Sequence, residues 1–193
     1  MKKVHHFPVS GKIGNAADGL CYRKRFIRGR IVERGMPAGL KPSSSPIAVS
    51  FSVQESAANT FTEARVDLQL NPLDNEVFVV TGINLDPAVP DALAGQNTST
   101  EASLTSTSQS GTGAVANLSN PNCLATAFLD IRAQGFVDGG VSFERSFSDS
   151  PTSGVEYIGI IATNDFFIQI EGGHNAAGKF LSGRMWGYRA TAS

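Results

Sequence analysis

The stretch T-F-T-E-A-R-V-D-L-Q-L-N-P-L-D-N-E-V-F-V-V-T-G-I-N-L, residues 60–85, decides the fold class. In its first part, apolar side chains occupy the even positions from Ala64 to Leu70 and polar ones the odd positions from Glu63 to Gln69. A period of two indicates a strand with one face on a core and one in water. After the N-P-L-D-N turn, the β-branched run at 76–85 predicts a strand covered on both sides.

The same two patterns recur along most of the chain. Strands are predicted at 47–53, 60–70, 76–85, 124–133, 141–147, 155–163, 165–170 and 181–190. Between them lie short segments rich in Gly, Pro, Asn and Asp, which are the residues that turns favour. No amphipathic helix interrupts the series. We therefore predict an all-β protein, an antiparallel and jelly-roll-like β-sandwich.

For two segments the sequence predicts a specific local structure. T-N-D, residues 163–165, separates two apolar runs, and Asn164 and Asp165 both tolerate the left-handed backbone of a tight turn. The runs at 155–163 and 165–170 are therefore expected to pair as a hairpin. Residues 96–113 are rich in Ser and Thr and poor in large apolar side chains. They are expected to form a long exposed loop or a pair of ragged edge strands.

The charge distribution divides the chain into two regions. The 193 residues are 41% hydrophobic and 17% charged, and their formal net charge is −1. Residues 1–41 nevertheless hold ten Lys and Arg against two acids, a net charge of +8. The rest holds six against fifteen, a net charge of −9. A basic segment on an acidic body indicates that the segment has a partner of its own.

Most of the positive charge lies in C-Y-R-K-R-F-I-R-G-R-I-V-E-R-G, residues 21–35. Because K-P-S-S-S-P at 41–46 is typical of a linker, we predict an extended basic arm and linker over 1–46 and a β-sandwich over 47–193. The aromatic contact residues are expected to be Tyr22 and Phe26. The cations expected to contact nucleic acid or other subunits are Lys2, Lys3, Lys12, Arg23, Lys24, Arg25, Arg28, Arg30 and Arg34.

Three interpretations of this basic run stay open. It can be an edge strand whose cations prevent unwanted sheet pairing. It can neutralise phosphates while Tyr22 and Phe26 stack on bases, without reading sequence. It can also cross onto the acidic body of a neighbouring subunit, where opposite charges would fix the register. The interleaved Phe26, Ile27 and Ile31 favour the ordering of part of the run against protein.

Patterns that would indicate catalysis or metal binding are not found. The sequence contains no G-x-S-x-G, H-E-x-x-H or C-x-x-C, and its only histidines are His5, His6 and His174. We therefore expect no enzymatic activity, no cofactor and no metal site. His174 is predicted to be a polar loop residue. Asp86 and Asp91 are predicted to lie in proline-rich turns and not to bind a cation.

The first residues of the chain and its two cysteines give information on the cellular compartment of the protein. M-K-K-V-H-H-F-P-V-S-G-K lacks the apolar run of a secretory signal, and no stretch reaches the length of a membrane helix. We expect a soluble protein that is not exported by that route and does not insert into membranes. Cys21 and Cys123 are predicted to be two buried thiols in preference to a disulfide.

A basic, glycine-containing arm, a P-S-S-S-P hinge and a strand-rich region from Ile47 onward together resemble the small single jelly-roll capsid proteins of icosahedral viruses. The resemblance is architectural and rests on no diagnostic motif. It implies a sandwich that forms the shell and an arm that touches the genome or threads between subunits. It therefore implies a virion structural protein assembled in the host cytoplasm, whose partners are copies of itself, packaged nucleic acid and other virion proteins.

Two further functions stay open. A non-specific single-stranded nucleic-acid-binding β-barrel module would need aromatic and basic side chains on one sheet face. Arg184, Trp186, Tyr188 and Arg189 near the end of the chain could supply a small platform of this kind. A carbohydrate-binding sandwich could use Trp186 and Tyr188. The simpler interpretation is a final strand whose aromatic face lies in the core.

Overall fold

The structure is a computed structural model, and it describes residues 37–135, 137, 140–146, 148–149 and 156–192. All of these residues belong to one unit, Glu33–Ser193. The side chains of residues 144–149 lie outside the description.

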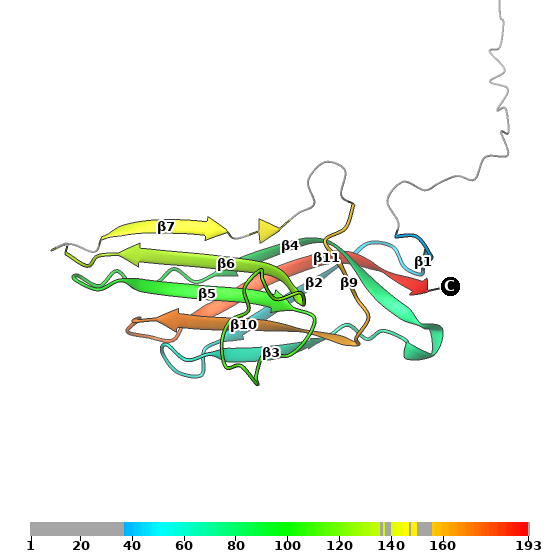
Figure 1. Ribbon diagram of the computed structural model, residues 1–193, viewed down its shortest axis with the longest axis horizontal. Coiled ribbons are helices and arrows are strands. Elements are labelled where there is room, and N and C mark those ends of the chain that lie inside the picture. Colours follow the sequence, from blue (N-terminus) through cyan, green and yellow to red (C-terminus); the bar gives the residue numbers. More distant parts are fainter. Residues whose placement is uncertain (1–36, 136, 138–139, 147, 150–155, 193) are drawn as a thin grey trace, which may run out of the picture. The chain divides into compact units, whose positions relative to one another are not determined.

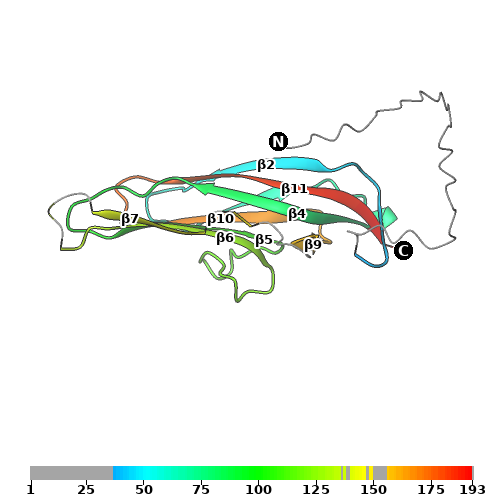
Figure 2. The same ribbon diagram turned by 90° about the horizontal axis from the view of Figure 1, so that it is seen from above.

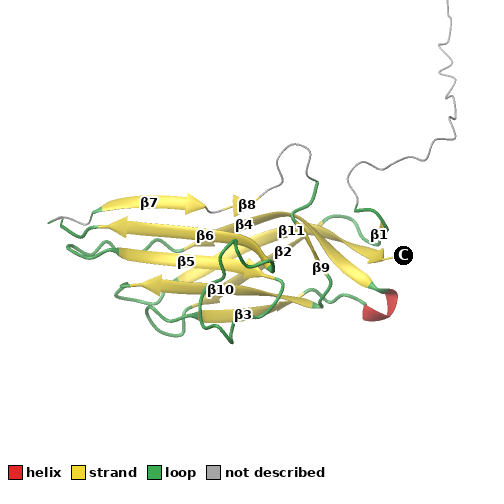
Figure 3. Cartoon of the chain, in the orientation of Figure 1, coloured by secondary structure: helices red, strands yellow, loops and turns green. Residues whose placement is uncertain are grey.

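Antiparallel strands form almost all of the regular structure, as predicted (Figures 1 and 3). Sheet A contains β1 (Leu40–Pro42), β2 (Ile47–Gln54), β4 (Glu76–Pro87), β8 (Ser148–Asp149), β9 (Gly159–Ile161) and β11 (Phe180–Ala192). Sheet B contains β3 (Thr62–Asp67), β5 (Thr98–Thr105), β6 (Cys123–Arg132), β7 (Val141–Ser146) and β10 (Asp165–Gly173). The one helical element in the described ranges is the 3-10 turn η1 (Pro72–Asp74).

The strand order is that of a jelly roll. In sheet A, β11 lies between β4 on one side and β1 and β2 on the other, and β8 and β9 pair with the far edge of β4. Sheet B has the order β3-β10-β5-β6-β7. The chain crosses between the sheets from β2 to β3, β3 to β4, β4 to β5, β7 to β8, β9 to β10 and β10 to β11, which gives the double Greek-key arrangement of this fold. Figure 2 shows the two layers edge-on.

The core lies between the two sheets and is built from alternate side chains. Phe166, Ile168 and Ile170 of β10 are completely buried, as are Leu181 and Met185 of β11. The expected alternation at 60–70 is confirmed, because Leu68 and Leu70 are buried at even positions. The β-branched run at 76–85 is covered on both sides, since Val79 and Val80 both have 0% exposure.

The predicted hairpin at 163–165 is wrong. β9 pairs with β4 in sheet A, whereas β10 pairs with β3 and β5 in sheet B. T-N-D instead carries the chain from one sheet to the other. The main-chain carbonyl of Asn164 accepts a hydrogen bond from the Leu68 N–H (2.8 Å), and its side-chain carbonyl accepts one from the Leu70 N–H (2.5 Å). Asn164 is thus tied to the end of β3 and not to a neighbouring hairpin arm.

The prediction for residues 96–113 is also wrong in part. Residues 98–105 form β5, an interior strand of sheet B that pairs with β10 and β6. Ala102 and Leu104 face the core, and the polar Thr100 is completely buried beside them. The described segment that follows, 106–122, does run outside the strands. It lies on the outer side of sheet B, away from sheet A (Figure 2).

Residues 41–46 do not form the free linker that their composition suggests. Lys41 and Pro42 belong to β1, which pairs with the end of β11. The N–H groups of Ser43 and Ser44 both lie within hydrogen-bond distance of the Arg189 carbonyl, at 2.8 and 3.3 Å. Strand pairing therefore begins before residue 47, and sheet A includes part of the predicted linker.

Candidate interaction surfaces

All of the contact residues predicted in the arm precede Pro37. The cations from Lys2 to Arg34 and the aromatic residues Tyr22 and Phe26 therefore lie outside the described residues. Their roles stay predictions. The described sandwich instead offers two sheet faces, the loops at its ends and one edge strand as candidate surfaces.

The outer face of sheet B is partly covered by the 106–122 segment, which a buried polar network holds in place. Gln169 is completely buried; its Oε1 accepts a hydrogen bond from Ser103 Oγ (2.6 Å), and its Nε2 donates to Glu63 Oε2 (2.9 Å). Glu63 in turn accepts from the N–H of Gln109 (2.6 Å). The Ala116 N–H donates to Ser103 Oγ (3.2 Å). The covering segment is therefore fixed to the sheet through side chains of three strands.

The same face is acidic. Glu171 of β10 and Glu101 of β5 are directly opposite each other in the register, which places two carboxylates side by side. The guanidinium of Arg65 lies 2.7 Å from Asp165 and 3.0 Å from Asp67, and that of Arg132 lies 2.9 Å from Asp130. The charged residues on this face of β3, β5, β6 and β10 are Glu63, Asp67, Glu101, Asp130, Asp165, Glu171, Arg65 and Arg132. Both cations are thus engaged with acids, and negative charge remains in excess.

An exposed apolar strip runs along the β6–β7 side of this face. Val141 and Phe143 on β7 are each 50% exposed, and Val137 just before them is 95% exposed. Phe143 pairs in register with Asp130 of β6, so both side chains face outward. Leu118 from the covering segment is 72% exposed. Because β7 is the last strand of sheet B, this strip also borders a sheet edge.

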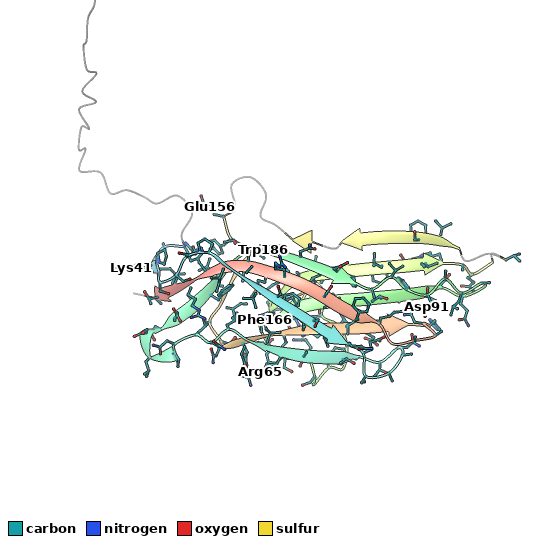
Figure 4. All side chains as sticks on the ribbon, turned by 180° about the vertical axis from the view of Figure 1, so that it is seen from behind. Lys41, Arg65, Asp91, Glu156, Phe166 and Trp186 are labelled. Atoms are coloured by element: carbon teal, nitrogen blue, oxygen red, sulfur yellow. The ribbon has the colours of Figure 1, made fainter. Side chains whose placement is uncertain are left out.

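The outer face of sheet A has a different character. Trp186 is 40% exposed there, so the interpretation that β11 turns its aromatic face into the core is wrong. The inward positions of β11 are taken by Leu181, Gly183 and Met185. Figure 4, in which sheet A faces the reader, shows Trp186 on β11. A hollow of about 470 Å³ beside it is lined by Ser50, Phe51, Asn84, Asp86, Ser182, Gly183, Arg184 and Trp186.

The four residues expected to form one stacking platform do not share a surface. Arg189 is turned from that platform, because its Nη2 donates to the main-chain carbonyl of Leu68 (3.0 Å). Tyr188 is half-buried, and its hydroxyl is enclosed without a hydrogen-bond partner in the described part of the chain. Burial and the neighbouring Glu156 and Tyr157 raise the pKa of Tyr188. The exposed pair is therefore reduced to Arg184 and Trp186.

The loops at one end of the sandwich are organised by two carboxylates. Glu55, only 5% exposed, accepts hydrogen bonds from the N–H groups of Thr60 (3.1 Å), Gly172 (2.6 Å) and Lys179 (2.6 Å). Asp91 forms an ion pair with Lys179 Nζ at 2.5 Å and accepts from the Ala176 N–H at 2.9 Å. Figure 4 shows Asp91 at this end.

The hydrogen bond from Lys179, assisted by the N–H groups of Ala176 and Ala177 and opposed by partial burial, lowers the pKa of Asp91. A pKa lowered by folding stabilises the folded state above the pKa of the unfolded chain, and this stabilisation is lost as the pH falls through the folded value. We expect Asp91→Asn to be less stable than wild type at pH 7, with a difference that shrinks below about pH 4. Urea denaturation of both proteins across this range measures it, and a difference that does not change with pH would contradict the assignment.

Other residues singled out in the sequence have ordinary positions. His174 is an exposed loop residue with φ of 57°, as predicted. Asp91 follows β4 in a loop, but Asp86 lies inside β4 and not in a turn. The Cys123 thiol lies 3.5 Å from the Ala125 carbonyl oxygen, while Cys21 precedes the described residues.

Among the residues that the structure describes, no group of three or more His, Cys, Asp or Glu side chains is placed to hold a metal ion. Within the same ranges, no helix has the length and apolar character needed to cross a membrane.

A scan against protein-family models finds no family that matches the chain, and a search of curated proteins finds no relative.

Proposed function

We propose that this protein is a virion structural protein, a capsid subunit that assembles with copies of itself into a shell. The jelly-roll sandwich supports the proposal, since this fold is used by viral capsid proteins as well as by lectins and cupins. Fold by itself does not define function. The proposal therefore depends on how charge and apolar surface are distributed over the chain.

The observation that carries the proposal is the separation of charge between the first 41 residues and the sandwich. The net charges of these two parts are +8 and −9. Arg65, Arg132 and Lys179 are held in ion pairs, and Arg189 is turned toward Leu68. Arg184 is exposed on sheet A, but ten of the sixteen Lys and Arg lie in the first 41 residues, which lead into β1. Such a segment can contact packaged nucleic acid, the acidic sheet B of a neighbour, or both.

The exposed strip of Val137, Val141 and Phe143 supplies a contact between copies. An edge strand with outward apolar side chains and open main-chain groups is a template for association with another chain. In a closed shell such an edge is covered by the next subunit.

Phe143→Asp is expected to raise the protein concentration required for assembly at least tenfold. The reason is that a charge in an apolar contact costs roughly 2 kcal/mol or more. The folded subunit should keep its thermal midpoint, since Phe143 is half exposed. Light scattering against concentration measures assembly. Phe180→Asp, which alters a 55% exposed aromatic residue on sheet A, is the matched control. Equal loss in both variants would contradict the use of the β7 strip.

The arm is tested by comparing the full chain with one that lacks residues 1–36 and keeps β1. Size-exclusion chromatography with light scattering gives the assembly state, and absorbance at 260 and 280 nm gives the nucleic-acid content. Loss of assembly assigns the arm to contacts between subunits, whereas assembled particles without nucleic acid assign it to the genome. A full-length monomer that binds single strands with salt-sensitive affinity would reject the shell and favour the single-strand-binding module.

A further inference from the structure

The outer face of sheet A contains a hollow that the proposed assembly does not use. The registers of β2, β11 and β4 arrange its side chains in three rows. In the first row Trp186 lies between Ala48 and Gly82. The second and third rows are Ser50, Arg184, Asn84 and Ser52, Ser182, Asp86. Large side chains thus stand beside small ones, which leaves the hollow of about 470 Å³ open to solvent.

Trp186 provides an aromatic surface at one end of this hollow. A Cβ added at Gly82 would lie 3.5 Å from Cε3 of the indole, an ordinary van der Waals distance, so the ring lies beside Gly82 of β4. The indole is 40% exposed, and it is therefore supported on one side by the sheet and accessible on another.

The polar groups around the hollow are available to a ligand. The Arg184 Nε donates to Ser50 Oγ (3.2 Å), which orients the guanidinium and leaves its other N–H groups for other acceptors. The side chains of Asn84 and Asp86 and the indole N–H of Trp186 form no hydrogen bond with any residue that the structure describes. The hollow thus offers donors, an amide and a carboxylate acceptor within two rows of an aromatic ring.

We propose that this hollow binds a neutral saccharide, with a sugar ring against Trp186 and hydroxyl groups on Arg184, Asn84 and Asp86. A sugar presents an apolar C–H face that packs on an aromatic ring, and hydroxyl groups that donate and accept hydrogen bonds. Binding sites commonly combine an apolar surface with a few placed polar groups of this kind. Two residues of a strand span roughly 7 Å, so the three rows extend over roughly 14 Å along β11, which is long enough for more than one sugar unit.

Competing ligands fit the hollow less well. A nucleic-acid strand could stack a base on Trp186, but the Asp86 carboxylate would repel its phosphates, and Arg184 is the one cation among the described residues that line the hollow. An apolar peptide would cover the carboxylate and the amide without giving them partners. The saccharide binding is a property of the sandwich, and it stands whether or not the chain forms a shell.

Intrinsic fluorescence tests the proposal directly, because Trp186 is the only tryptophan in the 193 residues. The full-length protein is titrated with maltotriose, mannotriose, triacetylchitotriose and lactose. We expect a saturable change in indole emission with at least one of them. Arg184→Ala and Asp86→Ala should each weaken that affinity about tenfold, the effect of losing one hydrogen bond to a charged group.

Arg65→Ala is the matched control, since it removes an exposed guanidinium from the other sheet, and its affinity should equal that of wild type. Ligand-observed saturation-transfer NMR should show that Trp186→Ala no longer binds. The proposal is overturned if no saccharide gives a saturable change, or if Arg184→Ala and Asp86→Ala bind as wild type does. It is also overturned if oligothymidylate saturates the fluorescence change and the saccharides do not.

Discussion

Glu55→Ala is expected to lower the free energy of unfolding by roughly 4 kcal/mol, because three main-chain N–H groups lose their acceptor in a buried site. These groups belong to Thr60 in the loop before β3, to Gly172 at the end of β10 and to Lys179 just before β11. Hydrogen bonds to a charged acceptor contribute about 1.5–3 kcal/mol each, and their loss is not fully additive. Chemical denaturation at pH 7 measures the change.

Glu55→Gln is the companion variant. Its side chain keeps the shape and one carbonyl acceptor but replaces the other oxygen by a donor, so we expect about half of the alanine effect. If Glu55→Ala does not fold, the glutamine variant still tests the interpretation. Stability equal to wild type in Glu55→Gln, together with a mild effect of alanine, would show that the carboxylate does not hold these loops.

Phe166→Ala is expected to cost about 3–5 kcal/mol, the range for removing a large aromatic side chain from a close-packed core. Phe166 has 0% exposure, and its ring meets that of Phe51 edge-to-face with centroids 5.6 Å apart. The loss combines burial, the aromatic contact and the cavity that remains between the sheets. Figure 4 shows the position of Phe166 behind sheet A.

Phe180→Ala provides the comparison, since it removes the same group from a site that is 55% exposed. Its free energy of unfolding should be within about 0.5 kcal/mol of that of wild type. The two variants would have similar stabilities only if the sheets did not pack through β10 and β2. That result would contradict the sandwich itself.

Alternation of apolar and polar residues was sufficient to predict most of the strands. β4 and β10 could be predicted because their inward side chains are large and apolar, as in Phe78, Phe166 and Ile168. The all-β sandwich followed from the number of such segments and from the turn residues between them.

The interior position of β5 in sheet B was not predicted, because the burial of this strand depends on the rest of the chain. Thr98, Thr100 and Ser103 are polar in isolation, yet sheet A covers one side of the strand and the 106–122 segment covers part of the other. Burial of small polar residues is a tertiary effect that local hydrophobicity does not report. The hairpin prediction at T-N-D was wrong because the same turn residues suit both a hairpin and a crossing between sheets, and local sequence does not distinguish the two.

The hollow on sheet A was only partly visible in the sequence. Trp186 and Arg184 lie on one face of β11, and Leu181 and Met185 lie on the other. Because both faces include large apolar side chains, the sequence of β11 alone does not indicate which face meets the core. Asn84 and Asp86 come from a strand distant in sequence and join them only through the β4–β11 register. No local motif marks such a combination.

Assembly of the wild-type chain shows whether this protein is a capsid subunit. The purified full-length protein is examined by sedimentation velocity and negative-stain microscopy at near-physiological salt, after nuclease treatment to remove adventitious nucleic acid. A capsid subunit should form closed particles of uniform diameter that sediment far faster than a 20.3 kDa chain. A monomer or small oligomer at every protein concentration and salt condition, with or without added nucleic acid, would contradict it.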